Sequence, residues 1–275
     1  MAGERTPDGL VYDVTGSGPA VLLVHEGIAD RRLWDPQWER WSDRFTLIRY
    51  DHRGFGESDD PAAGFSRHGD ALAVLDAAGV DQAHLIGASM GGRAALDLTL
   101  AAPDRVAALV AVVATPSGWE HSADLLARFE EVEAAYESGG LEAANEVELR
   151  MWVDGEHRDP EQVDPALRSK VSRMNYAALE REEALEQQGL DVEPTELDPP
   201  AIGRLAEVTA PVLVVTGALD QPSVNAGAAA MAAGIQGARA VEIAETAHLP
   251  MLERPDAFEA AVLPFLEAAP TAARS

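Results

Sequence analysis

The sequence predicts an α/β fold with a mostly parallel central sheet of about eight strands and helices on both faces. Apolar segments of strand length alternate with segments of helical periodicity in the first part of the chain and again at its end. Several strand segments, such as Ala20–His25, are apolar throughout, as expected of strands buried on both faces. This alternation favours a parallel sheet because helices carry the chain back across its faces.

The first run of elements extends to about residue 114. We predict strands at Leu10–Val14, Ala20–His25, Phe45–Tyr50, Ala83–Ile86 and Val106–Ala114. We predict the helices between them at Trp34–Arg44, Ser66–Ala78 and Met90–Ala101. Pro103 ends the last of these helices because proline cannot donate a helical hydrogen bond.

The character of the sequence changes after Thr115. Between Gly118 and about Arg204 the pattern predicts three to five helices and no strand. The alternation then resumes, with elements at Val212–Thr216, Ser223–Ala233, Ala240–Ala244 and Pro255–Glu267. We therefore expect a core of residues 1–117 and 205–275 and a helical cap (lid) of residues 118–204, inserted after the sixth strand. A cap there lies over the carboxyl ends of the strands, where parallel sheets bind ligands.

The composition excludes several classes of function. The chain has 275 residues, 21 Lys and Arg against 47 Asp and Glu, and a formal net charge of −26, which argues against nucleic acid and anionic membranes as partners. It has no cysteine, so disulfides, thiol nucleophiles and cysteine–metal sites are excluded. His25 and Glu26 do not begin a zinc-binding helix, because Ala29 stands where the second histidine is required. We expect neither a metal nor another cofactor.

The N-terminal residues Met1–Asp8 are polar, and no apolar run approaches the roughly 20 residues that span a bilayer. We therefore expect a cytoplasmic protein that acts on a small molecule, as a monomer or a homodimer.

The strongest local motif is G-A-S-M-G at residues 87–91, which follows a predicted strand and begins a predicted helix. This is the context of a nucleophile elbow, in which glycines on both sides let the chain turn sharply around Ser89. The helix N-terminus also directs N–H groups at a developing oxyanion. We predict that Ser89 is a nucleophile.

A serine nucleophile needs a base and an acid. His248 follows the last predicted strand, and Asp220 follows the strand at 212–216, so both leave the same edge of the sheet as Ser89. Asp191 and Asp198, inside the predicted cap, are weaker candidates for the acid. The chain order of serine, aspartate and histidine is that of elbow-type hydrolases.

Four stretches then resemble the α/β-hydrolase fold superfamily of serine hydrolases, and they cover nearly the whole chain. They are L-L-V-H-E-G at 22–27, D-H-R-G-F-G-E-S at 51–58, G-A-S-M-G-G at 87–92 and A-H-L-P at 247–250, the last with Glu253, Pro255 and Phe258. The motif M-W-V-D-G at 151–155 is similar to that of enol-lactonase-like and small carboxylesterase members.

The resemblance implies an oxyanion hole made by the backbone N–H groups of Gly27 and Met90. Glu26 stands where the family usually has glycine. Two alternatives follow for its side chain: an ion pair with Arg31, Arg32 or Arg53 that points it away from the site, or a position where it selects substrate or perturbs His248. The expected substrate pocket is lined by Glu26, Trp119, Met151, Trp152, Met174 and Leu249.

The resemblance implies a serine hydrolase that cleaves an ester or lactone of a small, largely apolar molecule through an acyl-enzyme. The same triad serves C–C bond hydrolysis, perhydrolysis and natural-product tailoring, and some members bind ligands with little turnover. Sequence patterns leave these alternatives open.

Overall fold

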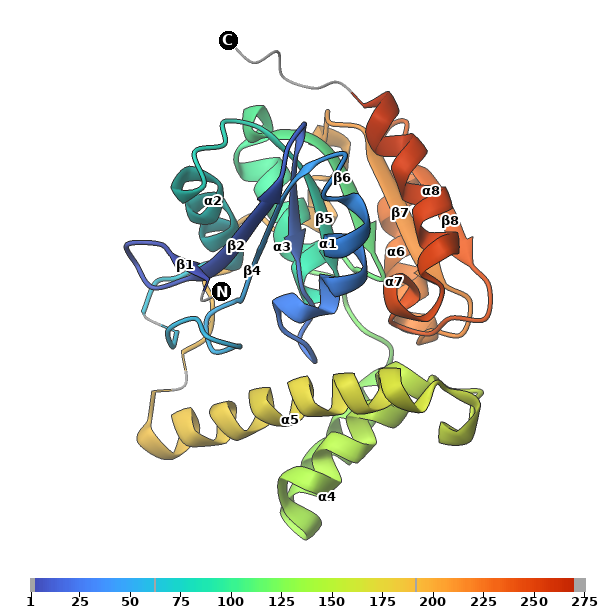
Figure 1. Ribbon diagram of the computed structural model, residues 1–275. Coiled ribbons are helices and arrows are strands. Elements are labelled where there is room, and N and C mark those ends of the chain that lie inside the picture. The colour runs from blue at the N-terminus through green and yellow to red at the C-terminus, as the bar shows by residue number, and fades with distance from the viewer. Residues whose placement is uncertain (1–2, 62, 191, 270–275) are drawn as a thin grey trace.

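The structure is a computed structural model that describes residues 3–61, 63–190 and 192–269 (Figure 1). Its centre is an eight-stranded sheet with the strand order β1-β2-β4-β3-β5-β6-β7-β8. The strands are β1 (Glu4–Arg5), β2 (Val11–Gly16), β3 (Ala20–Val24), β4 (Thr46–Tyr50), β5 (Ala83–Ala88), β6 (Val106–Val112), β7 (Val212–Gly217) and β8 (Arg239–Ile243). β2 runs antiparallel to β1 and β4, and all other neighbours are parallel. The predicted fold class is confirmed.

The central strands form because their side chains are buried on both faces. Every residue of β6 is buried, as its uninterrupted apolar sequence predicts, and every residue of β5 is buried too, His84 included. The strand β1 was not predicted. It has two exposed charged residues and joins the sheet only through pairing with Tyr12 and Val11, so it carries no hydrophobic pattern.

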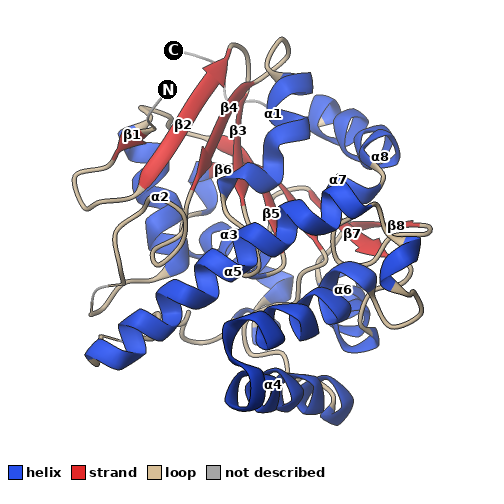
Figure 2. Ribbon diagram, turned by 60° about the horizontal axis from the view of Figure 1, so that its bottom comes forward, coloured by secondary structure: helices blue, strands red, loops and turns tan. Residues whose placement is uncertain are grey.

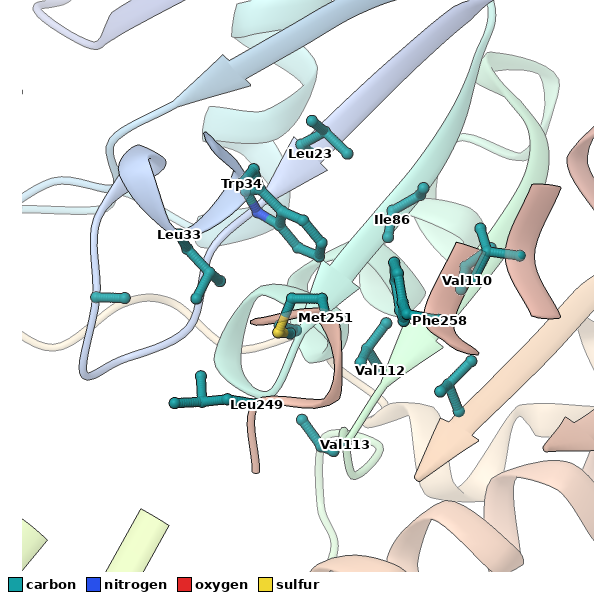
Figure 3. Close-up of a cluster of buried hydrophobic side chains, with 14 of the residues drawn as sticks. Leu23, Leu33, Trp34, Ile86, Val110, Val112, Val113, Leu249, Met251 and Phe258 are labelled. Atoms are coloured by element: carbon teal, nitrogen blue, oxygen red, sulfur yellow. The ribbon is translucent and has the colours of Figure 1, made fainter. Parts of the chain in front are cut away.

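Two layers of helices cover the sheet (Figure 2). One face packs against α1 (Asp35–Trp41) and α8 (Pro255–Ala268), and the other against α2 (Arg67–Ala77), α3 (Met90–Ala101) and α6 (Pro222–Gly234). On the first face the rings of Trp41 and Phe258 stack at 6.2 Å between centroids. Figure 3 shows Phe258 and Trp34 against the inward side chains of Ile86, Val110 and Val112. These contacts fix α8, and with it the loop that carries the candidate base.

Local sequence explains where the helices begin. The predicted helix at Trp34–Arg44 is a 3-10 turn, Arg31–Trp34, followed by α1, which has proline in its first turn. The Asp30 side chain caps the 3-10 turn by accepting a hydrogen bond from the backbone N–H of Arg32 at 2.9 Å. In the same way, Ser66 caps α2.

The segment between β6 and β7 contains two long helices, α4 (Ala123–Glu148) and α5 (Pro165–Gln188). In Figure 1 they lie together beside the core, below the sheet. A π-helix, Leu149–Asp154, joins the end of α4 to the core, and short 3-10 helices complete the segment. We call residues 118–204 the helical insertion. No helix in the described ranges is both long and apolar enough to cross a bilayer.

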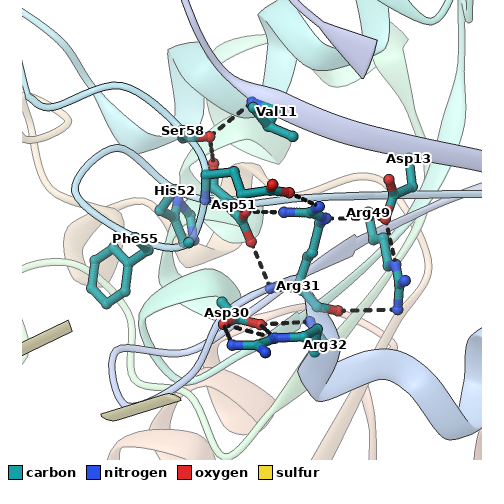
Figure 4. Close-up of polar contacts among 12 residues, drawn as sticks. Val11, Asp13, Asp30, Arg31, Arg32, Arg49, Asp51, His52, Phe55 and Ser58 are labelled. Carbon is teal, nitrogen blue, oxygen red and sulfur yellow. Dashed lines mark hydrogen bonds and ion pairs between the residues drawn. The ribbon is translucent and has the colours of Figure 1, made fainter. Parts of the chain in front are cut away.

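The turn after β4 is braced around Asp51 (Figure 4). Its carboxylate accepts hydrogen bonds from the backbone N–H groups of Arg31 and Glu57, both at 2.9 Å, and pairs with the Arg31 guanidinium. Ser58 donates to the Asp51 carbonyl at 2.6 Å and accepts from the N–H of Val11 at 2.8 Å. The turn is therefore rigidly attached to the sheet edge, next to the loop that follows β3.

Candidate active site

Ser89 lies in a strained turn between β5 and α3. Its backbone has φ 49° and ψ −114°, which is rare for a residue with a side chain. A Cβ atom at Gly87 would collide with the carbonyl of Gly91, and one at Gly91 would collide with the carbonyls of Val24 and His25. The glycines are therefore required by close backbone contacts, as the motif predicts. They hold the start of α3 against the loop that leaves β3.

Asp220 and His248 form a buried pair at the same edge of the sheet. The Nδ1 atom of His248 lies 2.9 Å from Oδ1 and 2.8 Å from Oδ2 of Asp220. The two loops meet because Gly217 leaves no room for a side chain beside the carbonyl of Ala247. Burial alone would lower the pKa of His248, but the charge and hydrogen bond of Asp220, aided by Glu26 and Glu253, raise it above its ordinary value.

Among the described residues, no hydrogen bond joins the Ser89 hydroxyl to His248. The structure thus places a strained serine and a buried acid–base pair after three parallel strands without showing the serine–histidine contact. Such contacts are often long in unliganded hydrolases and shorten when substrate binds. Of the rival acids, Asp191 lies outside the described residues, and Asp198 is exposed.

Gly27 and Met90, the predicted oxyanion-hole residues, lie on the two segments that the elbow glycines bring together. Met90 is the first residue of α3, so its N–H belongs to the free first turn of the helix. Gly27 follows β3 by three residues, and a Cβ atom there would meet nothing within 4 Å. The structure therefore leaves space beside Gly27 for a bound group.

Glu26 is buried and has no hydrogen-bond or ion-pair partner among the described residues. Its side chain is 1% exposed, and neither carboxyl oxygen makes a hydrogen bond. The alternative of an ion pair is wrong, because the three candidate arginines bind other acids. Burial raises the pKa of Glu26 to about 8; His248 acts to lower it, and Asp220 and Glu253 act to raise it. Glu26 therefore interacts electrostatically with the acid–base pair.

The π-helix of the insertion contacts the candidate base directly and also contacts Gln221, the neighbour of the candidate acid. The ring of Trp152 packs on that of His248 at 4.5 Å between centroids, and its carbonyl accepts the backbone N–H of His248 at 3.2 Å. The Met151 carbonyl accepts a hydrogen bond from Gln221 Nε2 at 2.9 Å. π-helical turns are frequent at functional sites. The insertion is thus attached to the residues that would carry out the chemistry.

The remaining predicted pocket residues have different environments. Leu249 is fully buried beside His248, whereas Met174 is buried in the hydrophobic core shared by the insertion and the sheet. Trp119 packs near Gly227 of α6, and within the described part of the chain it makes no contact with Asp220 or His248. The structure therefore gathers Glu26, Trp152 and Leu249 around His248, but not Trp119 or Met174.

Sequence reasoning missed the residues that tie the insertion to the site. Arg158 donates to the carbonyls of Asp154 and Val153 and to the Glu253 carboxylate at 2.6 Å. Glu253 in turn accepts the N–H of Ala247 at 2.8 Å. Glu253 accompanies the A-H-L-P motif at 247–250, so the sequence could have indicated it as a residue that supports the His248 loop. Arg158 lies in a polar stretch with no pattern that would distinguish it.

Comparisons with known proteins agree with this geometry. The family described as alpha/beta hydrolase fold matches residues 19–255. RutD of Caulobacter segnis, provisionally named a carbamate hydrolase, is 29% identical over 282 residues, which span 96% of this chain and 98% of that protein. The structure of a thermophilic esterase from Thermogutta terrifontis has a TM-score of 0.76, 26% identity and 97% coverage of both chains.

The enol-lactonase of Burkholderia xenovorans LB400 is similar in structure, with a TM-score of 0.75 and coverage of 96% of this chain and 100% of that chain. Its identity to this chain is 24%, so the likeness concerns the fold alone.

Proposed function

The chain belongs to the alpha/beta hydrolase fold family, and from this premise we propose that it is a serine hydrolase of carboxylic esters or lactones. The observation that carries the proposal is the buried Asp220–His248 pair, placed at the same sheet edge as the strained Ser89. Strain at a non-glycine residue is typical of functional sites, and here it falls on a serine, whose hydroxyl can act as a nucleophile.

The mechanism follows from the tautomer that Asp220 imposes. Because its carboxylate faces Nδ1 of His248, that nitrogen carries the hydrogen, and Nε2 is free to accept the Ser89 proton. The Ser89 oxygen then attacks the carbonyl carbon. The resulting oxyanion accepts hydrogen bonds from the N–H groups of Gly27 and Met90, contacts of a kind worth about 3 kcal/mol each.

Collapse of this intermediate completes the first half of the reaction, and the proton now moves away from His248. The His248 imidazolium donates its Nε2 proton to the leaving alcohol, and the C–O bond breaks to give the acyl-enzyme. Water then loses a proton to His248 and attacks the acyl carbon. The bond between that carbon and the Ser89 oxygen breaks as His248 returns the proton to Ser89, which releases the acid and restores the free serine. Asp220 stabilises the imidazolium in both halves, in agreement with the raised pKa of His248.

A second candidate is carbamate hydrolysis. The observation that favours it is the full-length similarity to a protein provisionally named a carbamate hydrolase. The same residues would attack the carbamate carbonyl, and His248 would protonate the leaving amine. C–C bond hydrolysis, perhydrolysis and slow ligand binding remain alternatives for the same triad. The helical cap, a cytoplasmic location and a monomeric or homodimeric state stay predictions.

The test is hydrolysis of p-nitrophenyl acetate, butyrate and octanoate by the wild type and Ser89→Ala, with a methyl carbamate series alongside. We expect turnover that falls by at least about 10³-fold in Ser89→Ala. Ser138→Ala is the matched control, because Ser138 is an exposed serine that bonds only within α4. Equal activity in wild type and Ser89→Ala would reject Ser89 as the nucleophile.

A further inference from the structure

A cavity of about 170 Å³ lies between the helical insertion and the core, next to the predicted oxyanion loop. On the core side Gly27, the Arg53–Phe55 turn, Phe65 and Arg67 line it. On the other side its walls come from the end of α4, from α5 and from residues 192–194. Because Gly27 is part of the wall, a substrate held at the oxyanion hole can extend into this cavity.

Arg67 differs from the other arginine of the cavity. Arg53 is fully engaged: its Nε bonds both oxygens of Asp70 at 3.0 and 3.1 Å, and Nη2 bonds Asp8 at 2.6 Å. Arg67 makes no hydrogen bond or ion pair with any described residue. Its guanidinium carbon lies 5.8 Å from the ring centroid of Phe65, which covers one side of it. All five N–H donors of Arg67 are therefore without an acceptor among the residues that the structure describes.

The charge of Arg67 is also poorly compensated. Burial lowers its pKa, and Tyr50, Glu196, Asp70 and Glu193 do not offset that effect. A guanidinium still keeps its proton at such a half-buried site, so the charge persists. The charge acts as far as His25, at the start of the oxyanion loop, where it adds to burial in lowering the pKa of that histidine.

The acids that line the same cavity belong to the insertion and its exit. Glu148 accepts a hydrogen bond from Asn175 Nδ2 at 2.6 Å, and burial raises its pKa, which weakens its tendency to carry a charge. Glu182 lies one turn further along α5 than Leu179, and Glu193 is exposed. A ligand with an anionic end would meet the free donors of Arg67 on the core wall.

We propose that this cavity is a subsite in which Arg67 binds a carboxylate carried by the substrate, at a distance from the bond that is cleaved. A planar guanidinium matches a carboxylate with two parallel hydrogen bonds, and an orphaned guanidinium beside an apolar ring is preorganised for that contact. The inference rests on the proposed hydrolase function and names its substrate class: small esters or lactones with an apolar chain and a carboxylate end.

The test compares methyl esters of straight-chain monocarboxylic acids with the monomethyl esters of dicarboxylic acids of the same length, from four to eight carbons. For the wild type we expect one chain length at which the carboxylate raises kcat/KM at least about tenfold. Arg67→Gln should abolish that preference while changing kcat/KM of the neutral ester less than about twofold, and Arg67→Lys should restore part of it.

Arg239→Gln is the matched control, because Arg239 is exposed on β8 and makes no ion pair with a described residue. It should keep the wild-type preference. A wild type that favours the neutral ester at every length, or an Arg67→Gln variant with unchanged preference, would overturn the proposal.

A second readout does not depend on turnover. Calorimetry should detect monomethyl adipate binding to Ser89→Ala, and at least about tenfold weaker binding to the Ser89→Ala, Arg67→Gln double variant. If the wild type hydrolyses no ester, the proposed function fails, yet this comparison still decides the role of Arg67. Equal affinity of the two variants, or no binding by either, would reject the subsite.

Discussion

Two of the places where the helical insertion meets the core differ in how their polar groups are satisfied. At the π-helix, the carbonyls of Met151 and Trp152 accept hydrogen bonds from Gln221 and His248, and Asp220 binds His248 on the other side. At the cavity beside Gly27, the guanidinium of Arg67 has no partner among the described residues. The acid and base proposed for the chemistry make hydrogen bonds within the protein. The guanidinium proposed for recognition makes none with a described residue and is available to a ligand.

The difference has a physical reason. A general base works only if its tautomer and orientation are fixed before substrate arrives, so its partners must be protein groups. A binding group contributes most affinity when its donors make no hydrogen bonds within the protein before the ligand arrives. A charge left without a protein partner meets that condition, but it lowers the stability of the folded chain. At the π-helix the polar groups are therefore hydrogen-bonded within the protein, whereas at the cavity the guanidinium of Arg67 is free to bind a ligand.

The largest effect is expected from a substitution at the π-helix contact, where the polar groups are all hydrogen-bonded within the protein. Asp220→Asn should lower kcat/KM for p-nitrophenyl butyrate by about 10⁴-fold, because the amide no longer enforces the Nδ1–H tautomer of His248. The fold should persist, since the amide keeps the shape of the carboxylate. Asp198→Asn is the control, as Asp198 is exposed, and it should retain wild-type activity. A similar loss in both variants would mean that Asp220 is not the acid.

A smaller effect should follow when the ring above the base is removed. Trp152→Ala deletes an aromatic contact worth about 0.5–1.5 kcal/mol, which corresponds to a twofold to tenfold loss in kcat. Trp119→Ala removes an indole that packs on α6 instead, and kcat should change less. Steady-state kinetics of the two variants decide whether the π-helix supports the base. An equal loss in both would assign the effect to general loosening of the insertion.

The smallest effect is expected at Glu26. This residue lies near His248 but, unlike Asp220, makes no hydrogen bond with a described residue. Because the pKa of Glu26 is raised to about 8, only the fraction of Glu26 that is ionised near neutral pH favours the protonated form of His248, so Glu26→Gln should lower the pKa of His248 by a small amount. Since His248 acts as a base only when neutral, the acid limb of the kcat/KM profile should move to lower pH. A limb that stays in place, or moves to higher pH, would show that Glu26 does not act through His248.

The stability of the same variant gives a second readout. In the folded chain the pKa of Glu26 is raised to about 8 by burial, whereas an unfolded glutamate has its ordinary value of 4.5. The unfolded state therefore loses a proton first, and the free energy of unfolding of the wild type should fall, relative to Glu26→Gln, between pH 4.5 and about 8. Urea unfolding across that range measures it. Glu137→Gln, at an exposed position, should show no such trend.

Much of the fold could be predicted because it depends on local patterns. The uninterrupted apolar run of β6 and the glycine spacing around Ser89 act over a few residues, so they are visible in the chain itself. Element ends were displaced by one to three residues, as at β5, which continues to Ala88. The two-residue strand β1 was missed because it exists only through its pairing with β2.

The sequence by itself determined the α/β order, the strained serine and the positions of Asp220 and His248 after parallel strands, because strand direction brings those ends to one edge. Tertiary structure alone decided three other features: the burial of Glu26, the packing of Trp152 on His248, and the position of Arg67 in a cavity. Neither Glu26 nor Arg67 has an ion-pair partner among the described residues. Each of these features depends on which distant side chains come near, and which do not. Arginine and glutamate have the same local preferences whether or not a partner is found, so only the folded chain separates the two cases.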